Sequence, residues 1–154
     1  MSDGLAAAAP ALAALERQTG RDGIEGLVVE AARWRETAAL VQQAGFVRFL
    51  DVTVVDHPSD AARFEVVMHV YSPQAKKWLR LRTRTAATLA SLVPVFPAAN
   101  WYEREVFDLF GVRFEGHPDL TRIVLPDDFP THPLRRDHAL GSEPVDFTIL
   151  REDA

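Results

Sequence analysis

Alternating apolar and polar positions predict three consecutive strands in the middle of the chain, at 49–55, 63–71 and 77–85. The second strand alternates most regularly, with an apolar residue at every other position from Phe64 to Val70. The first is rich in β-branched residues, which are typical of strands. A Ser-Pro-Gln turn separates the second strand from the third, so these two are expected to form a hairpin.

Apolar residues also recur at helical spacing on either side of these strands. At 31–44 they predict a helix that Gly45 ends. A central helix is predicted at 98–110, because Pro97 suits the start of a helix and Gly111 suits its end. Three shorter elements complete the pattern: a weak helix at 11–18, a strand at 27–30, and a short helix that Thr85 caps and that runs to Ala90.

These elements together predict an α+β fold. It consists of a small antiparallel sheet of three or four strands with helices packed on one face, followed by an extended proline-rich C-terminal arm. Residues 1–20 are rich in alanine and are expected to be poorly ordered or weakly helical. Residues 21–114 would form the α+β domain, and residues 115–154 would form the arm.

The arm is predicted from its prolines and its regular apolar residues. Proline lacks a backbone N–H and fixes φ, so the prolines between 118 and 133 exclude a helix or a central strand there. Apolar residues recur in the same segment, which is not the composition of a disordered tail. They are Leu120, Ile123, Val124, Leu125, Phe129 and Leu134. Such an arm needs a surface, either on its own small domain or on another protein.

One charged residue of the central helix interrupts its apolar side. Tyr102, Val106 and Leu109 lie in a broad apolar arc of the helical wheel, and Glu103 falls inside that arc. A buried carboxylate is costly unless a cation or several hydrogen-bond donors meet it. We therefore expect a fixed partner for Glu103, most simply an arginine of this chain or of another one. The opposite, polar side of the wheel holds Trp101, Arg104, Glu105 and Asp108.

Composition limits the classes of function. The chain has 154 residues, of which 47% are hydrophobic, and is expected to form one domain. Its net charge of −5 argues against nucleic acid or an anionic membrane surface as the main partner. Without cysteine it has no ligands for its own iron–sulfur cluster or thiolate zinc site. It has no apolar run near the roughly 20 residues of a membrane span and no basic-then-apolar leader, so we expect membrane association only through other proteins.

Histidines and aspartates in the arm raise the alternative of a metal site. No pair of them sits at i, i+4 on a helix, and two of the histidines precede a proline in an extended segment. Turn and docking roles, with rings and carboxylates bonded to backbone, are therefore favoured. The residues concerned are His117, His132, His138, Asp119, Asp127, Asp128 and Asp137.

Acid–base chemistry by Glu103, Glu105 and Asp108 is also disfavoured. Arg104 can pair with Asp108 at i, i+4, and no nucleophile accompanies the carboxylates. We therefore predict no catalytic residue, no metal ligand and no cofactor-binding residue in this chain.

A row of arginines has two interpretations. Arg80, Arg82 and Arg84 alternate on one face of the third strand. A solvated sheet face is the favoured interpretation, as in other half-exposed antiparallel sheets. The alternative is a docking stripe for an acidic partner, since strand arginines also cover apolar surface.

The most distinctive stretch begins at Trp101 and reads WYEREVFDLFGVRFEGHPDLTRIVLPDDF, followed by HPLRRD. It resembles the signature of the 30 kDa subunit family, also called the C subunit, of respiratory complex I (NADH:quinone oxidoreductase). The chain can be laid on this family's pattern from about Leu27 to Leu140, the upstream part only in its order of strands and helices.

Two positions depart from the family's pattern. Thr121 stands where the family usually has an arginine, which removes one possible salt bridge to a partner. His138-Ala139 replaces an aromatic-proline pair and leaves the path of the last arm residues open.

The resemblance implies a non-catalytic structural subunit in the hydrophilic arm of this proton-translocating enzyme. Its chief partners would be the quinone-site large subunit (the D subunit), on which it docks, and neighbouring iron–sulfur subunits. The chain itself would bind no cofactor, whereas the complex would use NADH, FMN, iron–sulfur clusters and quinone for electron transport. The protein would lie at the cytoplasmic side of the cell membrane, peripheral to it, and would support electron transfer from NADH to quinone.

The same resemblance implies interface and structural roles for three groups of residues. The helix that anchors the arm would contribute Trp101, Tyr102, Glu103, Arg104, Glu105 and Asp108, with Gly111 after it. The turn of the arm would be shaped by Phe114, Gly116, His117, Pro118, Asp119, Leu120 and Arg122. Contact with the partner would come from His132, Pro133, Leu134, Arg135, Arg136 and Asp137.

Two alternatives remain beside this interpretation. Similar subunits occur in membrane-bound hydrogenases and formate hydrogenlyase-type complexes, although the HPDL and HPLR sequences favour the quinone-reducing branch. An alternative of another class is a stand-alone metal-dependent enzyme that uses the histidine and aspartate cluster.

Overall fold

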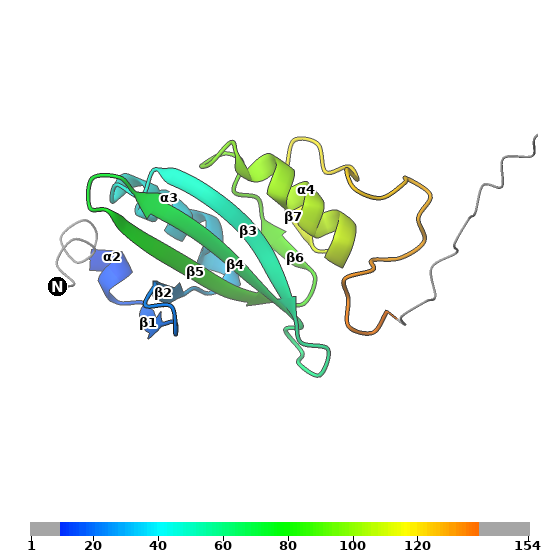
Figure 1. Ribbon diagram of the computed structural model, residues 1–154, viewed down its shortest axis with the longest axis horizontal. Helices are drawn as coiled ribbons and strands as arrows, with labels where there is room; N and C mark the ends of the chain where they lie inside the picture. Colours follow the sequence, from blue (N-terminus) through cyan, green and yellow to red (C-terminus); the bar gives the residue numbers. More distant parts are fainter. Residues whose placement is uncertain (1–9, 139–154) are drawn as a thin grey trace, which may run out of the picture.

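The computed structural model describes residues 10–138, which form a five-stranded sheet with helices on one side (Figure 1). The strands follow the spatial order β1-β2-β5-β4-β3. Their bounds are β1 Glu16–Thr19, β2 Glu25–Val28, β3 Arg48–Asp56, β4 Phe64–Ser72 and β5 Lys77–Thr85. The three long strands β3, β4 and β5 are antiparallel neighbours. This confirms the predicted hairpin of β4 and β5 and the antiparallel sheet that β3 forms with it.

The sheet is mixed and wider than the predicted antiparallel sheet of three or four strands. β2 lies parallel to β5, with Glu25 opposite Leu79, and β1 joins β2 in antiparallel register. The predicted helix at 11–18 is wrong beyond α2 (Pro10–Ala13), because the chain then becomes extended as β1. The residues of β1 are all polar and exposed, so no apolar periodicity signals a strand, and the pairing with β2 determines it.

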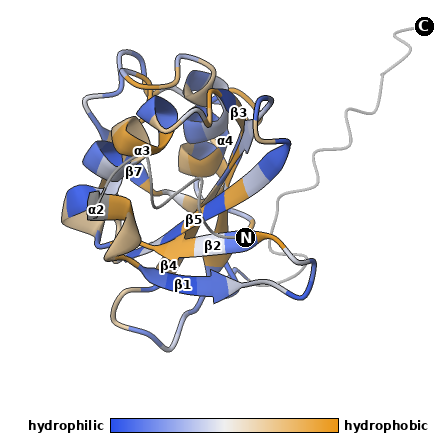
Figure 2. Ribbon diagram, turned by 90° about the vertical axis from the view of Figure 1, so that its left-hand side faces the viewer, coloured by the Kyte–Doolittle hydropathy of each residue, from blue (hydrophilic) through white to orange (hydrophobic). Residues whose placement is uncertain are grey.

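The helices cover one face of the sheet (Figure 2). The 3-10 turn η1 (Ala31–Arg33) leads into α3 (Trp34–Gln43), and the central helix α4 runs from Ala99 to Phe110. Trp34 and Val41 of α3 and Val106 of α4 are buried in one core with Met68 and Leu81 from the sheet. The alternation in β4 therefore has the predicted consequence, since its apolar side is buried in this core.

The short helix expected after Thr85 is a strand. The Thr85 hydroxyl bonds the carbonyl oxygen of Thr88 at 2.5 Å and accepts from its amide at 3.2 Å, which closes a turn instead of capping a helix. β6 (Thr88–Ala90) then pairs in parallel with β7 (Arg113–Glu115), which begins just after α4. This pairing fixes both ends of α4 against the domain, because the segments that precede and follow the helix share a two-stranded sheet.

Within residues 10–138, no helix combines the length and the apolar character needed to cross a bilayer.

Candidate functional site

Asp108 of α4 is fully buried and anchors the segment that follows the domain. Its carboxylate accepts a hydrogen bond from Arg122 Nη1 at 2.7 Å. It also accepts from the backbone amides of Ile123, Val124 and Leu125 at 3.0, 2.8 and 3.0 Å. Burial alone would raise the pKa of Asp108, but the three amides and Arg122 together hold this pKa below its ordinary value. The ionised carboxylate therefore fixes a turn of the chain against the side of α4.

The burial of Asp108 corrects two predictions. The helical wheel placed this residue on the polar side of α4, yet residues 122–125 cover it. Arg104 does not pair with Asp108. It donates instead to the Thr121 carbonyl oxygen at 3.1 Å and to the Thr121 hydroxyl at 2.7 Å. Thr121, which departs from the family's pattern, thus has an internal role as the partner of Arg104.

The C-terminal end of α4 is capped by side chains from the same downstream segment. Gly111 ends the helix in the left-handed region at φ 76°, as its sequence position predicted. His132 Nδ1 donates to the Asp108 carbonyl oxygen at 2.8 Å, and Arg135 Nε donates to that of Phe110 at 2.6 Å. A Cβ on Gly111 would come within 2.6 Å of His132 Nε2, so only glycine leaves room for this cap. The backbone amides of Gly111 and Leu134 donate to the carbonyl oxygens of Phe107 and Leu109, so each of the last four carbonyls of the helix has a donor within the protein.

A second tie joins the end of the described chain to the sheet. Arg63 forms two hydrogen bonds with Asp56 at 2.6 and 2.7 Å and two with Asp137 at 2.7 Å. The Arg136 amide donates to Asp56 Oδ2 at 2.7 Å. Hydrogen bonds from Arg63 lower the pKa of Asp56 and lower that of Asp137 to about 2. Sequence reasoning missed Asp56 and Arg63, although opposite charges flanking the β3–β4 turn were a usable signal.

Residues 116–138 contain no helix or strand and are held by α4 and by the β3–β4 end of the sheet (Figure 1). The predicted partner-contact residues His132, Arg135, Arg136 and Asp137 all hydrogen-bond their own chain. Whether the same residues touch another protein stays a prediction, as does the extended arm, whose residues 139–154 lie outside the described part.

The remaining predicted site residues divide between the interior and the surface. Phe114 is buried in the core, Leu120 packs against it, and the Tyr102 ring meets Phe49 edge-on at 5.6 Å. Glu105, Gly116, Pro118 and Asp119 are exposed, while Pro133 is half-buried. Trp101, Val124 and Leu134 expose 62%, 56% and 51% of their surface, more than most large apolar residues of this fold. They make α4 and the following segment the most apolar exposed part of the predicted site.

Glu103 is buried as predicted, but an arginine is not its hydrogen-bond partner. Its carboxylate accepts from the Leu92 amide at 2.5 Å and from the Ser91 hydroxyl at 2.7 Å. His117 Nε2 lies 4.0 Å from Glu103 Oε2 and bonds the Asn100 carbonyl oxygen at 3.3 Å, while His117 Nδ1 accepts from the Asp119 amide at 3.0 Å. Burial raises the pKa of Glu103 to about 7, against the opposing effect of these two donors and of the Arg35 charge.

The histidines do not assemble a metal centre in the described part of the chain. In residues 10–138, no group of three or more histidine, aspartate and glutamate side chains is placed to hold a metal ion. His117 and His132 each bond backbone, in agreement with the turn role that the sequence favoured. The carboxylates of Glu103 and Asp108 are both occupied by hydrogen-bond donors that hold parts of the fold together.

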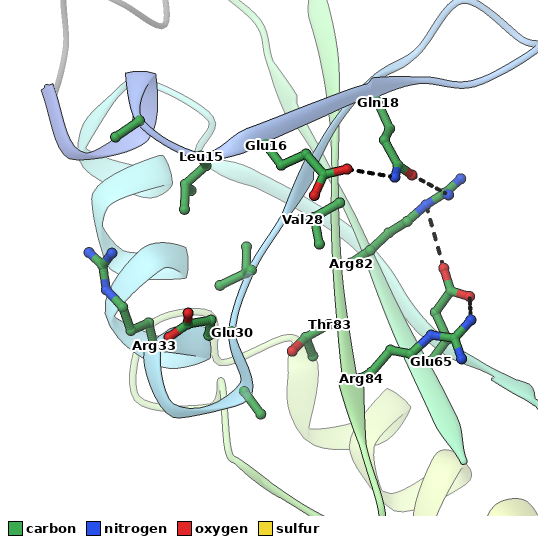
Figure 3. Close-up of a pocket in the computed structure, with 13 residues that line it drawn as sticks. Leu15, Glu16, Gln18, Val28, Glu30, Arg33, Glu65, Arg82, Thr83 and Arg84 are labelled. Atoms are coloured by element: carbon green, nitrogen blue, oxygen red, sulfur yellow. Dashed lines mark hydrogen bonds and ion pairs between the residues drawn. The ribbon is translucent and has the colours of Figure 1, made fainter. Parts of the chain in front are cut away.

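The arginine row of β5 is neutralised from within the fold. Arg80 pairs with Asp22 at 2.5 Å, Arg82 lies 3.8 Å from Glu65, and Arg84 pairs with Asp60 and Glu65. A cleft of about 730 Å³ opens where β2 separates from β5, with Arg82 and Arg84 on its wall (Figure 3). The figure shows Gln18, Arg82, Glu65 and Arg84 joined in one chain of contacts. The row is therefore an internal network more than a free docking stripe.

Glu103 generates a prediction about pH. Its pKa in the folded protein, about 7, lies above the ordinary value of 4.5, so folding takes up a proton between these values. The stability that the group contributes is full below about pH 4.5 and is lost as the pH rises through 7. The shift corresponds to about 3 kcal/mol. Glu103→Gln should remove this pH dependence from the free energy of unfolding, measured by urea denaturation between pH 4.5 and 8.

The exposed Glu105→Gln on the same helix is the matched control and should leave the pH dependence unchanged. Equal pH dependence in the wild type and in Glu103→Gln would contradict the raised pKa of the buried Glu103 side chain.

Asp108 generates a prediction about the downstream segment. Asp108→Asn removes the charge and places an amide group among four donors, so the free energy of unfolding should fall by about 2–4 kcal/mol. The amides of Ile123, Val124 and Leu125 should exchange with deuterium faster, and trypsin should cut sooner after Arg122. Asp119→Asn, at an exposed carboxylate, should change neither rate. Slow exchange in Asp108→Asn would show that other contacts hold this turn.

Comparison with known proteins places the chain among respiratory-complex subunits. A family model described as "Respiratory-chain NADH dehydrogenase, 30 Kd subunit" matches residues 27–144. The chain is 41% identical over 132 residues to the C subunit of NADH-quinone oxidoreductase from Rhodopseudomonas palustris (strain BisB18), covering 82% of this chain and 64% of that protein. It is 47% identical over 100 residues to the same protein from Chelativorans sp. (strain BNC1), covering 64% of this chain and 50% of that protein. The chain thus spans between about half and two thirds of these relatives.

Solved structures agree with this relationship. A trypsin-resistant fragment (1-134) of Nqo5 superposes with a TM-score of 0.64 and 29% identity, over 69% of this chain and 89% of that one. A chain of the membrane-bound sulfane sulfur reductase, an archaeal respiratory membrane complex, superposes with a TM-score of 0.73 and 28% identity, over 82% of this chain and 78% of that one. The sequence resemblance is confirmed by a match over most of the chain, and this protein belongs to the family of the 30 Kd subunit of respiratory-chain NADH dehydrogenase.

Proposed function

We propose that this chain is a non-catalytic structural subunit of the hydrophilic arm of a proton-translocating NADH:quinone oxidoreductase. It docks on the large subunit that lines the quinone site (the D subunit) and supports electron transfer from NADH to quinone without binding a cofactor itself. NADH, FMN, the iron–sulfur clusters and quinone belong to the neighbouring subunits. The chain is held at the cytoplasmic side of the membrane as a peripheral component. Membership of the family supports this proposal at the level of the complex.

The observation that carries the docking role is a rigid apolar surface on α4 and the segment after it. We call this the α4 surface and define it by Trp101, Ile123 and Val124, which expose 62%, 36% and 56% of their area. Arg104 lies over the Trp101 ring at 5.1 Å and bonds Thr121, and Asp108 holds the amides of Ile123 and Val124. A surface whose backbone is already fixed loses little conformational entropy when a partner covers it. Exposed apolar residues on such a surface are typical of a contact between subunits.

A second candidate is the equivalent scaffold subunit of another membrane-bound respiratory complex. The observation in its favour is the TM-score of 0.73 with a chain of the membrane-bound sulfane sulfur reductase. A membrane-bound hydrogenase or formate hydrogenlyase-type complex falls in the same class. The α4 surface would serve as a docking surface in each case, and only the neighbouring subunits would differ. A stand-alone metal enzyme is less well supported, because the rings of His117 and His132 are bonded to backbone.

The deciding experiment is gentle detergent extraction of the tagged chain from its native host. We expect recovery with a quinone-site subunit, iron–sulfur subunits and NADH:quinone reductase activity. Recovery with a nickel-binding large subunit and hydrogen chemistry would assign the chain to the second candidate. Recovery of the chain alone, with stoichiometric zinc or iron, would overturn the scaffold role.

The α4 surface generates its own prediction. Val124→Asp places a charge where an apolar contact is expected, and it should lower recovery of the complex at least tenfold at unchanged stability of the isolated chain. Val55→Asp, the same substitution at an exposed valine of β3, is the control and should leave recovery unchanged. Recovery should be measured by quantitative mass spectrometry of the tagged complex. Normal recovery of the Val124→Asp complex would exclude this surface from the contact.

A further inference from the structure

A second concave surface lies at the other end of the sheet, by the β4–β5 turn. It is a groove of about 450 Å³ between the start of β3 and the loop that precedes α4. Most of the residues that line it are apolar, namely Val47, Phe49, Pro73, Val95, Phe96, Pro97 and Ala98, and Gln42 and Arg48 are the polar ones. Val47 exposes 58% of its surface and borders this groove, so an apolar contact is available to a partner there.

The two polar side chains that line the groove differ in whether they already form hydrogen bonds within the fold. The Gln42 side chain donates to the Val95 carbonyl oxygen at 2.7 Å, so its amide is already used within the fold. Arg48 is exposed and forms no hydrogen bond or ion pair with any residue of the part that the structure describes. The Arg48 guanidinium, which has no partner among the described residues, therefore lies beside the apolar residues of the groove.

Positive charge is concentrated around this groove. The segments at this end of the domain, residues 42–49, 70–78 and 92–98, contain no aspartate or glutamate. They carry Arg48, Lys76 and Lys77 on a chain whose net charge is −5. Trp78, which is half exposed, packs on Tyr71 at 5.4 Å, and the register places Tyr71 opposite Arg48. This end of the sheet thus joins a cationic rim to an exposed aromatic pair.

The arginines of β5 already form ion pairs, whereas Arg48 at the groove pairs with no described residue, and this difference favours the groove as the site for an acidic partner. Arg80, Arg82 and Arg84 each lie beside a carboxylate of their own chain, so an acidic partner would have to displace an existing ion pair. Arg48 has no such competitor among the described residues. The sequence suggested an acidic partner for the arginine row. Such a partner could pair with Arg48 at the groove without displacing an ion pair of the described residues.

We propose that this groove is a second docking site, which takes a segment of a neighbouring subunit that carries a large apolar side chain next to an aspartate or glutamate. The apolar side chain fills the groove beside Phe49 and Phe96, and the carboxylate pairs with Arg48. The identity of the neighbour rests on the proposed function, whereas the chemistry of the segment follows from the lining and the charge of the groove.

The experiment places a photo-cross-linking benzoylphenylalanine at Val47 of the tagged full chain in its native host. After illumination, the complex is purified and the cross-linked peptide is identified by mass spectrometry. We expect one peptide from a neighbouring subunit, with an aspartate or glutamate within two residues of a leucine, isoleucine, methionine or aromatic residue. Adding Arg48→Glu should lower the cross-link yield at least tenfold, because the carboxylate would then meet a like charge.

Two controls separate charge from general damage. Arg48→Lys keeps the positive charge, although not the planar guanidinium, and should retain the yield within about twofold if charge attraction holds the segment. Arg21→Glu reverses an exposed charge outside the groove and should leave the yield unchanged.

Each remaining outcome decides the proposal. A cross-linked peptide without a carboxylate, a cross-link to residues 139–154 of the same chain or to a second copy, or no cross-link in an assembled complex would overturn it. If the purified complex lacks NADH:quinone reductase activity, the proposed function fails while the cross-link still decides whether the groove takes an acidic apolar segment.

Discussion

The buried carboxylate of Asp108 is the constraint on which the position of the segment after the domain depends. One side chain accepts hydrogen bonds from Arg122 and from three consecutive amides, and its own backbone carbonyl accepts one from His132. A charge taken out of water is tolerated only with such a set of donors. The donors all come from the segment after the domain, so the position of that segment and the ionisation of Asp108 require each other.

The sequence predicted the helices and strands that bury one face, because their apolar residues recur at the period of the element. β4, β5, α3 and α4 fall close to their predicted bounds, because one face of each packs into the common core. β1 and β6 were missed because their strand state comes from a partner elsewhere in the chain. The fold class was predicted, while the width and the mixed character of the sheet were not.

The sequence predicted which segment forms the candidate site, but it did not predict the hydrogen-bond partners of the residues in that site. Burial of Glu103 followed from its place in an apolar arc, but Ser91 and Leu92 could not be chosen as its donors without the loop geometry. Asp108 lies on the polar side of the wheel and is buried only because the downstream chain folds over it. Arg104 likewise reached Thr121 instead of its helical neighbour, since tertiary bonds can replace a surface i, i+4 pair of small energy.

The parallel pairing of β2 with β5 also bears on how the chain folds. The register that joins Glu25 to Leu79 links strands that are separated by α3, β3 and β4. During synthesis on the ribosome, β2 has no partner on that side until β5 has emerged, so Leu27 must wait uncovered while the intervening strands form. Non-local closure of this kind slows folding and exposes an apolar strand for longer. The polar, exposed β1 pairs with the other edge of β2, so only the edge that faces β5 lacks a partner until β5 has emerged.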